Sequence, residues 1–473
     1  MRRKFVWVAA FAAIFPFSAK RAAAGDLFPT NIQPAELTPP LVVITQLLTG
    51  IDLTLIDQAV ADDDLLTSGC DDTVPAMIDD PQMLIVDDDG MQCPQARFTR
   101  INDAISAAAP SAIIRVCPGT YRESVHVNKP GLVLQAARHQ GQATECQSPS
   151  TPDPTQEAIV VYHEAFPEFP TILMGFFVDA NDVTIEGFTV QPDLLSVGTQ
   201  QLGIGIFTNS SSSGFDIRHN VVQNNTFGVD VNNHAGGNTT HVRENCLRNN
   251  NLNLSQGGFG VFSNVGLNNA LIENNYCTGQ RGWCILLTGG PNVNVQVNHN
   301  ESVNDSTIGL FVTSNFTLNY NKVINPANTA LMLGTADING QVSFNNLYGG
   351  SSSANGISIN ASLGFANPGL GVANTLYVKS NKVTAFNWDG IHLDDGTFSN
   401  TLVTNRAENN VMAGIRATGQ SSNNTIQDNH MRGDHPDCYD DTHGMGTSGT
   451  ANFWIRDIGF TEFPAGICKH GNE

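Results

Sequence analysis

Basic residues are scarce in this sequence. Its 473 residues include 23 Lys and Arg against 44 Asp and Glu, which gives a formal net charge of −21. Proteins that bind nucleic acid neutralise phosphates with basic side chains, so this balance argues against a nucleic-acid partner. It also predicts that an anionic polysaccharide would be repelled unless Ca²⁺ bridged it to the protein.

Long apolar runs are absent after the N-terminus. The chain opens with basic residues at 2–4, continues with an apolar stretch at 5–17 that is short for a membrane span, and offers small residues at 22–24. We therefore expect residues 1–24 to be a signal peptide. The mature protein would be secreted or held in the cell envelope (extracellular or periplasmic), without a transmembrane segment. Removing five positive charges with the signal lowers the net charge to about −26.

Charged residues of both signs amount to only 14%, whereas Gly numbers 44, which favours a turn-rich, all-β chain. Its second half repeats a short pattern: an aliphatic residue, two variable residues, then Asn. The steps between successive Asn residues are 25, 30, 25, 21, 24, 36, 24 and 24, a period typical of solenoids. The Asn positions are Asn220, Asn245, Asn275, Asn300, Asn321, Asn345, Asn381, Asn405 and Asn429.

A second pattern alternates with the first, as in Gly228-Val229-Asp230-Val231 and Gly390-Ile391-His392-Leu393. Each repeat therefore holds at least two short strands with period-2 alternation and has no room for a long helix. We interpret the repeat as one coil of a parallel β-helix, with coils stacked about 4.8 Å apart. Asn suits the corner of each coil because it tolerates the left-handed backbone region and because stacked Asn amides can bond to one another.

An open end of such a solenoid would expose its apolar core, so a cap is needed. Residues 98–109 carry apolar side chains at helical spacing and stop at Pro110, and 112–116 then form a strand. We divide the chain into the signal peptide, an N-terminal extension (25–92) of undefined role, a helix-capped β-helix (93–433) and a C-terminal cap segment (434–473).

The opening of the repeat region resembles that of pectin lyase-like right-handed parallel β-helix proteins. The resemblance covers roughly residues 83–433 and implies a single right-handed β-helix of about ten coils. The catalytic motifs of pectinesterases, polygalacturonases and alginate epimerases are missing, so the resemblance leaves the activity open. The residues that carry it are Phe98, Ile101, Ala104, Ile105, Pro110, Ile114, Val116, Pro118, Gly119, Thr120, Tyr121, Glu123, Val125, Val127 and Lys129.

All nine cysteines follow residue 24, and in an exported protein they predict disulfides with one cysteine left over. The C-x-x-C spacing of zinc sites does not occur. We expect Cys93 to pair with Cys117 and Cys438 with Cys468. Cys246 and Cys277 follow the ladder Asn in adjacent coils, within disulfide reach.

The variable position of the second pattern should face outward and form one column along the stacked coils. His392 and Arg416 fall on neighbouring coils of this column, and Asp394 lies two residues after His392, on the same face. A base, a carboxylate and a cation are what proton abstraction next to a uronate carboxylate requires. The full column is Phe207, Asp230, Phe262, Leu286, Phe311, Met332, Ser358, His392 and Arg416.

We therefore take His392, Asp394 and Arg416 as candidate catalytic residues, and Asp394 with Asp395 as candidate calcium ligands. The alternative for this group is a solvated His beside a surface ion pair. Asp230 with His234, and the segment 435–443, are further polar clusters that loop structure would also explain. Phe207, Phe262 and Phe311 are a candidate platform for sugar rings.

Two functions fit the sequence about equally. The first is a secreted protein that acts on polysaccharide as a lyase or epimerase, with calcium as a candidate cofactor. The second is a non-catalytic envelope or surface β-helix that binds glycans or protein partners. A metal-handling role is disfavoured because clustered Met and Cys are lacking, and the oligomeric state stays open.

Overall fold

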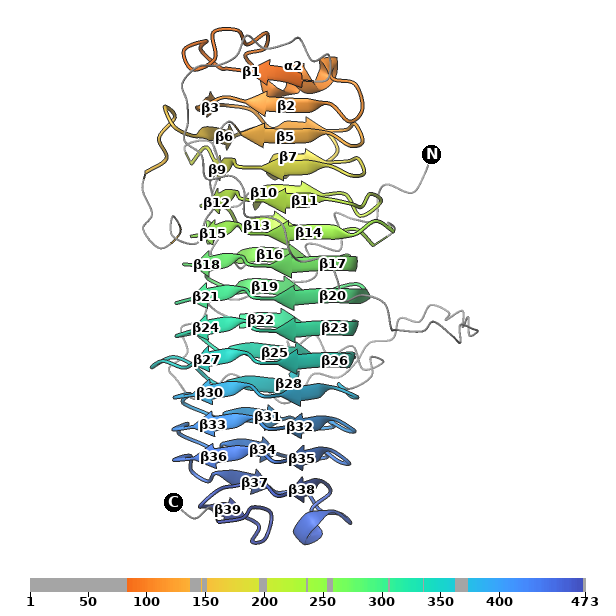
Figure 1. Ribbon diagram of the computed structural model, residues 1–473, viewed down its shortest axis with the longest axis vertical. Coiled ribbons are helices and arrows are strands. Elements are labelled where there is room, and N and C mark those ends of the chain that lie inside the picture. Colours follow the sequence, from red (N-terminus) through yellow and green to blue (C-terminus); the bar gives the residue numbers. More distant parts are fainter. Residues whose placement is uncertain are drawn as a thin grey trace, which may run out of the picture. The chain divides into compact units, whose positions relative to one another are not determined.

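The computed structural model describes residues 83–136, 146, 151–194, 202–234, 237–252, 258–304, 307–334, 336–361 and 373–470. The expected signal peptide and most of the expected N-terminal extension lie outside these residues. The described strands form three parallel sheets, which we call A, B and C. Strands from the three sheets alternate along the chain, and apart from the first and last coils each coil contributes one strand to each sheet in turn (Figure 1).

Sheet A has 14 strands. In spatial order they are β1 (Met83–Val86), β2 (Ile113–Val116), β5 (Val133–Ala136), β8 (Thr184–Glu186), β11 (Asp216–Arg218), β14 (Thr240–Arg243), β17 (Asn268–Glu273), β20 (Asn292–Asn298), β23 (Thr313–Asn319), β26 (Ile338–Ser343), β29 (Tyr377–Lys379), β32 (Thr401–Val403), β35 (Thr425–Gln427) and β38 (Phe453–Ile455).

Sheet B has 12 strands. They are β3 (Gly119–Tyr121), β6 (Ala158–Tyr162), β9 (Thr189–Pro192), β12 (Val221–Gln223), β15 (Cys246–Arg248), β18 (Tyr276–Thr278), β21 (Glu301–Val303), β24 (Lys322–Ile324), β27 (Asn346–Tyr348), β30 (Lys382–Thr384), β33 (Arg406–Glu408) and β36 (His430–Arg432).

Sheet C has 13 strands. They are β4 (Val125–Val127), β7 (Ile172–Val178), β10 (Leu202–Thr208), β13 (Phe227–Asp230), β16 (Phe259–Ser263), β19 (Trp283–Leu287), β22 (Thr307–Leu310), β25 (Leu331–Gly334), β28 (Ile357–Ala361), β31 (Ile391–Leu393), β34 (Ile415–Ala417), β37 (Cys438–Asp440) and β39 (Glu462–Phe463).

The predicted right-handed parallel β-helix is confirmed. Sheets of 12 to 14 strands mean more coils than the ten expected, because the Asn pattern begins only at Asn220 and several coils precede it. β1 already belongs to sheet A although it lies before residue 93, and β37 to β39 continue the winding after residue 433. None of the helices in the described residues has both the length and the apolar character needed to span a membrane.

Stacked aliphatic side chains fill the tube, as the period-2 alternation predicts. Val378, Leu402 and Ile426 pair in register on β29, β32 and β35 and are fully buried, while the residues on either side of each point outward. The predicted cap is also present. Helix α2 (Ile101–Ala107) buries Ile101, Ala104 and Ile105 beside β1 at the N-terminal end (Figure 1).

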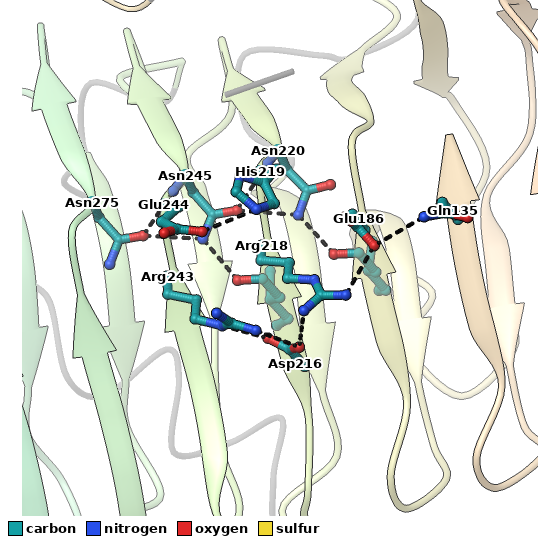
Figure 2. Close-up of polar contacts among 12 residues, drawn as sticks. Gln135, Glu186, Asp216, Arg218, His219, Asn220, Arg243, Glu244, Asn245 and Asn275 are labelled. Atoms are coloured by element: carbon teal, nitrogen blue, oxygen red, sulfur yellow. Dashed lines mark hydrogen bonds and ion pairs between the residues drawn. The ribbon is translucent and has the colours of Figure 1, made fainter. Parts of the chain in front are cut away.

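The ladder Asn residues bond from coil to coil inside the corner between sheets A and B. The Asn321 backbone N–H and Nδ2 both donate to Oδ1 of Asn345, and Nδ2 also donates to the Val297 carbonyl. Figure 2 shows the same arrangement for Asn220, Asn245 and Asn275.

Our expectation that the ladder Asn occupies the left-handed backbone region is wrong. The positive φ belongs to the residue just before it, for example Tyr320 at 57° and Phe344 at 57°. The Asn is required for its buried amide, which both donates and accepts, because an unpaired buried backbone group costs about 1–3 kcal/mol.

Four disulfides join the described cysteines, and Cys70 lies outside the described residues. Cys93–Cys117 and Cys438–Cys468 are confirmed. The pairing of Cys246 with Cys277 is wrong. Two separate disulfides, Cys146–Cys246 and Cys277–Cys284, occur instead. Cys246 is in register with Tyr276 and Cys277 with Leu247, so the two thiols are offset by one residue along neighbouring strands.

Candidate functional site

One column of side chains runs along the outer face of sheet C, through consecutive register pairs. Its N-terminal part is apolar and largely buried, and its C-terminal part is polar and partly exposed. The column is His126, Phe177, Phe207, Asp230, Phe262, Leu286, Gly309, Met332, Ser358, His392, Arg416, Tyr439 and Phe463.

Phe311 does not belong to this column. A register irregularity between β19 and β22 brings Gly309 into line with Leu286 and Met332. Phe311 follows the end of β22, where it meets the Trp283 ring edge-on at 6.2 Å. The three phenylalanines of the expected sugar platform therefore do not form a single row.

His392 and Arg416 are register partners on β31 and β34, as their repeat positions predict. Both reach toward Asp389, which precedes β31 and is 2% exposed. His392 Nδ1 lies 3.5 Å from Asp389 Oδ2, and Arg416 Nη1 lies 4.0 Å from the same oxygen. The other carboxylate oxygen accepts the Ala413 backbone N–H at 2.9 Å, so Asp389 is held from two coils.

Burial and the polar neighbours of Asp389 have opposite effects on the pKa of its carboxyl group. Burial raises the pKa of the carboxyl above its usual value, while His392, the Ala413 N–H and Arg416 pull it back. The far side of the His392 ring meets a hydroxyl: Nε2 lies 3.1 Å from Thr418 Oγ1. Asp389, His392 and Thr418 thus form a continuous polar row across two coils.

The cation and the aromatic rings continue the column toward the C-terminus. The Arg416 guanidinium lies over the Tyr439 ring at 4.7 Å, and Tyr439 stacks on Phe463 with ring centroids 5.5 Å apart. Phe463 is 54% exposed. Trp388, next to Asp389 in the chain, is 49% exposed and hydrogen-bonds through its backbone to Ala354 and Met412. Tyr439 and Phe463 therefore continue the column beyond Arg416, and Trp388 adds an exposed ring next to Asp389 in the chain.

Asp394 and Asp395 lie just past the end of β31 and do not join the His392 pair. Asp394 Oδ1 accepts the backbone N–H of Asp395 at 2.8 Å, and Asp395 Oδ1 accepts that of Gln420 at 2.6 Å. In the part of the chain that the structure describes, the group of three or more closely spaced metal-ligating side chains is Asp87, Asp88 and Asp89, at the other end of the solenoid. Calcium binding at Asp394 and Asp395 stays a prediction.

Thr418 and Tyr439 are the members of this site that the sequence reasoning missed, and Asp389 was predictable only as an acid close to His392 in the sequence. Thr418 follows Arg416 by two residues, so the rule that selected Asp394 also selects Thr418. Asp389 precedes its strand, and its direction depends on the turn before β31, which the period-2 pattern does not describe.

The other predicted clusters have structural explanations. Asp230 is fully buried and accepts from Asn232 Nδ2 at 2.8 Å, and burial raises its pKa to about 7. Within the segment 435–443, Asp437 accepts the backbone N–H groups of Phe460 and Thr461, which fixes the last coils.

Sheet A carries a separate network of ion pairs on its outer face. Asp216 bonds Arg218 and Arg243, and Arg218 also reaches Glu186 (Figure 2). The His219 ring meets Glu244 at 2.9 Å on the corner of the same coils. These pairs join side chains of opposite charge in successive coils, and we assign them a structural role.

No family model matches the sequence, and no curated protein matches it. Among solved structures, the chain is similar to the Dettilon tailspike protein gp208, at 12% identity over 79% of this chain and 68% of the other, with a TM-score of 0.46. It is similar to a mutant of DFA-IIIase from Arthrobacter chlorophenolicus A6 bound to DFA-III, at 13% identity over 73% and 88%, with a TM-score of 0.42.

The A-module of the mannuronan C-5 epimerase AlgE6 from Azotobacter vinelandii is similar at 11% identity over 76% of this chain and 79% of the module, with a TM-score of 0.32. Similarities at this level concern the winding of the chain and carry no information on its chemistry. The three parallel sheets identify the chain as a right-handed parallel β-helix protein.

Proposed function

We propose that the protein acts on a uronate-containing polysaccharide at the outer face of sheet C, as a lyase or an epimerase. His392 is the base and Arg416 is the cation that stabilises the developing negative charge. The proposal is supported above all by one observation: His392 and Arg416 are register partners on adjacent strands and share the buried carboxylate of Asp389.

The chemistry begins with removal of the proton next to the uronate carboxylate. A neutral imidazole can accept this proton, and Asp389 orients the ring and stabilises the imidazolium that forms. Charge then develops on the substrate carboxylate, where a guanidinium is an effective partner because its donors match both oxygens. Return of a proton to the other face gives an epimer, whereas loss of the glycosidic oxygen gives an unsaturated sugar.

Binding of the sugar rings is supported by the exposed aromatic residues. Tyr439 and Phe463 follow Arg416 along the column, and Trp388 lies beside Asp389. Apolar faces of pyranose rings stack on aromatic rings, so these three residues provide subsites on both sides of the base. A chain running along the solenoid axis would cross successive coils at about 4.8 Å intervals.

The acidic composition of the protein means that an anionic substrate needs charge screening to bind. A polyuronate approaches a surface with excess Asp and Glu, so one arginine must be assisted by counter-ions in solution or by bridging calcium. For localisation, four disulfides support a secreted or envelope protein, since disulfides persist in oxidising compartments.

The test is a panel of uronate polysaccharides incubated in deuterated buffer. Elimination is followed by the absorbance of the unsaturated uronate, and epimerisation by uptake of deuterium at the carbon that loses its proton. We expect one substrate to react and His392→Ala and Arg416→Ala each to abolish the reaction. His430→Ala and Arg432→Ala, on sheet B, are the matched controls. Full activity in His392→Ala would refute the assignment.

A second candidate function is non-catalytic binding of a glycan or a protein. It is supported by a row of three rings at the corner between sheets A and B. His299 stacks on Tyr320 at 4.9 Å and Tyr320 on Phe344 at 5.1 Å, and Tyr320 is 51% exposed. If this row is the functional surface, Tyr320→Ser weakens binding to a glycan array while His392→Ala does not.

A further inference from the structure

The hydroxyl of Thr418 contacts His392, and proton abstraction from a sugar does not require this hydroxyl. His392 lies between two oxygen atoms: Asp389 Oδ2 is 3.5 Å from Nδ1, and Thr418 Oγ1 is 3.1 Å from Nε2. The carboxylate is buried and held by the Ala413 N–H, whereas Thr418 is half-buried at the end of β34. A fixed acid, an imidazole and the hydroxyl of a half-buried Thr therefore follow one another in a row.

His392 makes an ion-pair contact with Asp389 at 3.5 Å and a hydrogen bond with Thr418 at 3.1 Å, and the direction of that hydrogen bond follows from the groups themselves. An ionised carboxylate only accepts, so it selects the tautomer of His392 with the proton on Nδ1. In this tautomer Nε2 carries a lone pair and accepts a hydrogen bond from the Thr418 hydroxyl. The hydroxyl also lies 3.5 Å from the Leu393 carbonyl, a longer and weaker alternative acceptor. In this arrangement His392 polarises Thr418 as a base polarises a nucleophile.

We propose that Thr418 is the nucleophile of a second activity, the hydrolysis of an ester such as an O-acyl group on a saccharide. Thr418 Oγ1 attacks the acyl carbon while its proton passes to His392 Nε2. The tetrahedral intermediate expels the alcohol oxygen, which takes that proton. Water then attacks the acyl-threonine through the same base, and the free acid and Thr418 are released. One ester and one water give one alcohol and one acid.

Arg416 supplies the positive charge that this reaction requires. It precedes Thr418 by two residues and therefore lies on the same face of β34. Its Nε is buried and has no hydrogen-bond partner in the described residues, and its side chain is 30% exposed overall, which leaves the two Nη groups to meet a substrate. The backbone N–H groups that follow the nucleophile cannot serve instead, because Gly419 donates to Asp441 and Gln420 donates to Asp395. The guanidinium is thus the cationic group adjoining the tetrahedral oxygen.

The choice of a saccharide ester as substrate rests on the proposed function. The activation of the Thr418 hydroxyl rests on its contact with His392 and is independent of that function. The two reactions also differ in what they need from His392. For proton abstraction from carbon, the Thr418 hydroxyl has to leave Nε2, so removing the hydroxyl does not harm elimination or epimerisation. For ester hydrolysis, removing it removes the reaction.

The experiment uses the full chain with two probes, p-nitrophenyl acetate and a fluorophosphonate that labels activated hydroxyls. We expect hydrolysis of the ester and a label that peptide mass spectrometry locates on Thr418. Thr418→Val, which has nearly the same shape without the hydroxyl, should lose activity by about 100-fold or more. Thr418→Ser should keep it, and Thr401→Val on sheet A is the matched control.

Several results overturn the proposal. They are a label on another residue, no label, and ester hydrolysis that survives in Thr418→Val. If Thr418→Val fails to fold, as judged by its melting temperature, the label on the unmodified chain still decides. The uronate assay separates this proposal from the proposed function: hydrolysis without elimination or epimerisation refutes only the latter, and the opposite result refutes only the role of Thr418.

Discussion

Asn321 Nδ2 donates to Oδ1 of Asn345 in the next coil at 3.1 Å, and both side chains are fully buried. The same contact recurs along the corner between sheets A and B, and the last rung is an acid: Asn429 donates through its N–H and Nδ2 to Asp457. Every side chain of the row except the last must both donate and accept a hydrogen bond. This explains why Asn occupies the inside of the row and Asp its end.

Replacing a middle rung should therefore destabilise the solenoid. Asn321→Ala leaves the Asn300 amide and the Val297 carbonyl without their partner, at a cost of about 2–5 kcal/mol in the free energy of unfolding. Thermal melting measures the loss. Gln296→Ala, on the outer face of β20, is the control and should leave the melting temperature nearly unchanged. Equal effects of both changes would contradict a role of the row in stability.

The buried acids that terminate the rows predict a stability that falls as pH rises. Asp434 accepts the backbone N–H and Nδ2 of Asn410, in the same way as Asp457 accepts those of Asn429. Burial raises the pKa of Asp434 to about 7 and that of Asp457 to about 6, from an unfolded value of 3.8. A folded pKa above the unfolded one means that the folded state holds the proton more tightly, so stability is full below pH 4 and decreases through pH 6 to 7. The double variant Asp434→Asn, Asp457→Asn should flatten this part of the melting profile.

The control for this profile is Asp103→Asn, which changes an exposed acid on helix α2. It should leave the difference in melting temperature between pH 5 and pH 8 unaltered. An unaltered difference in the double variant as well would show that the two acids are not responsible. A change of 1 kcal/mol in the free energy of unfolding corresponds to a shift of about 2–4 °C in the melting temperature of a domain of a few hundred residues.

The long-range disulfide should contribute more than the short one. Cys146–Cys246 joins residues 100 apart, and Cys277–Cys284 joins residues 7 apart. Cross-linking a 100-residue loop restricts the unfolded chain by about 4.7 kcal/mol in the loop-entropy estimate, and a short loop by less. Cys146→Ala with Cys246→Ala should therefore lower the melting temperature more than the matched pair at 277 and 284. The opposite order would point to strain or packing instead.

Much of this fold was predictable because its determinants are local and repeated. Aliphatic residues such as Val378 and Leu402 recur with the Asn, so the sequence displays the coil directly. The structural role of the ladder Asn was only partly predictable. A left-handed corner and a buried amide both favour Asn, and only the backbone angles of neighbours such as Tyr320 separate the two.

The site was predictable where it depends on register and unpredictable where it depends on a turn. His392 and Arg416 face one another because their coils stack, whereas Asp389 approaches them through the turn before β31. The pairing of Cys146 with Cys246 joins residues 100 apart in the sequence, which no repeat spacing encodes. The displacement of Phe311 arises from a register irregularity of the same unpredictable kind.

Calcium binding at Asp394 and Asp395 gives a fourth prediction. One half-buried carboxylate (Asp394) and one exposed carboxylate (Asp395), without a third close ligand in the described residues, should bind Ca²⁺ weakly, with a Kd of about 10⁻⁴–10⁻³ M. Isothermal titration should detect this binding, and Asp394→Asn with Asp395→Asn should remove it. If Ca²⁺ binding persists in the double variant, the calcium site is not at Asp394 and Asp395, and the next candidate is the group Asp87, Asp88 and Asp89. The variant Asp88→Asn tests that group.

The final prediction separates the roles of Asp389 and Arg416 in turnover of a uronate substrate. Asp389 is 2% exposed and acts through His392, so Asp389→Asn should lower kcat by about 100-fold or more and leave KM nearly unchanged. In the proposed mechanism Arg416 faces the substrate, so Arg416→Lys should raise KM as well as lower kcat, because an ammonium keeps the charge but loses the planar pair of donors.

Steady-state kinetics across pH measures both effects, with Arg432→Lys as the control for the arginine. The shape of the Asp389→Asn profile should also change, since an amide no longer stabilises the imidazolium or selects the Nδ1–H tautomer of His392. A structural role alone would lower the amount of folded protein without changing the shape of that profile. An unchanged profile with normal kcat in Asp389→Asn would remove Asp389 from the mechanism and leave the His392–Arg416 pair without its support.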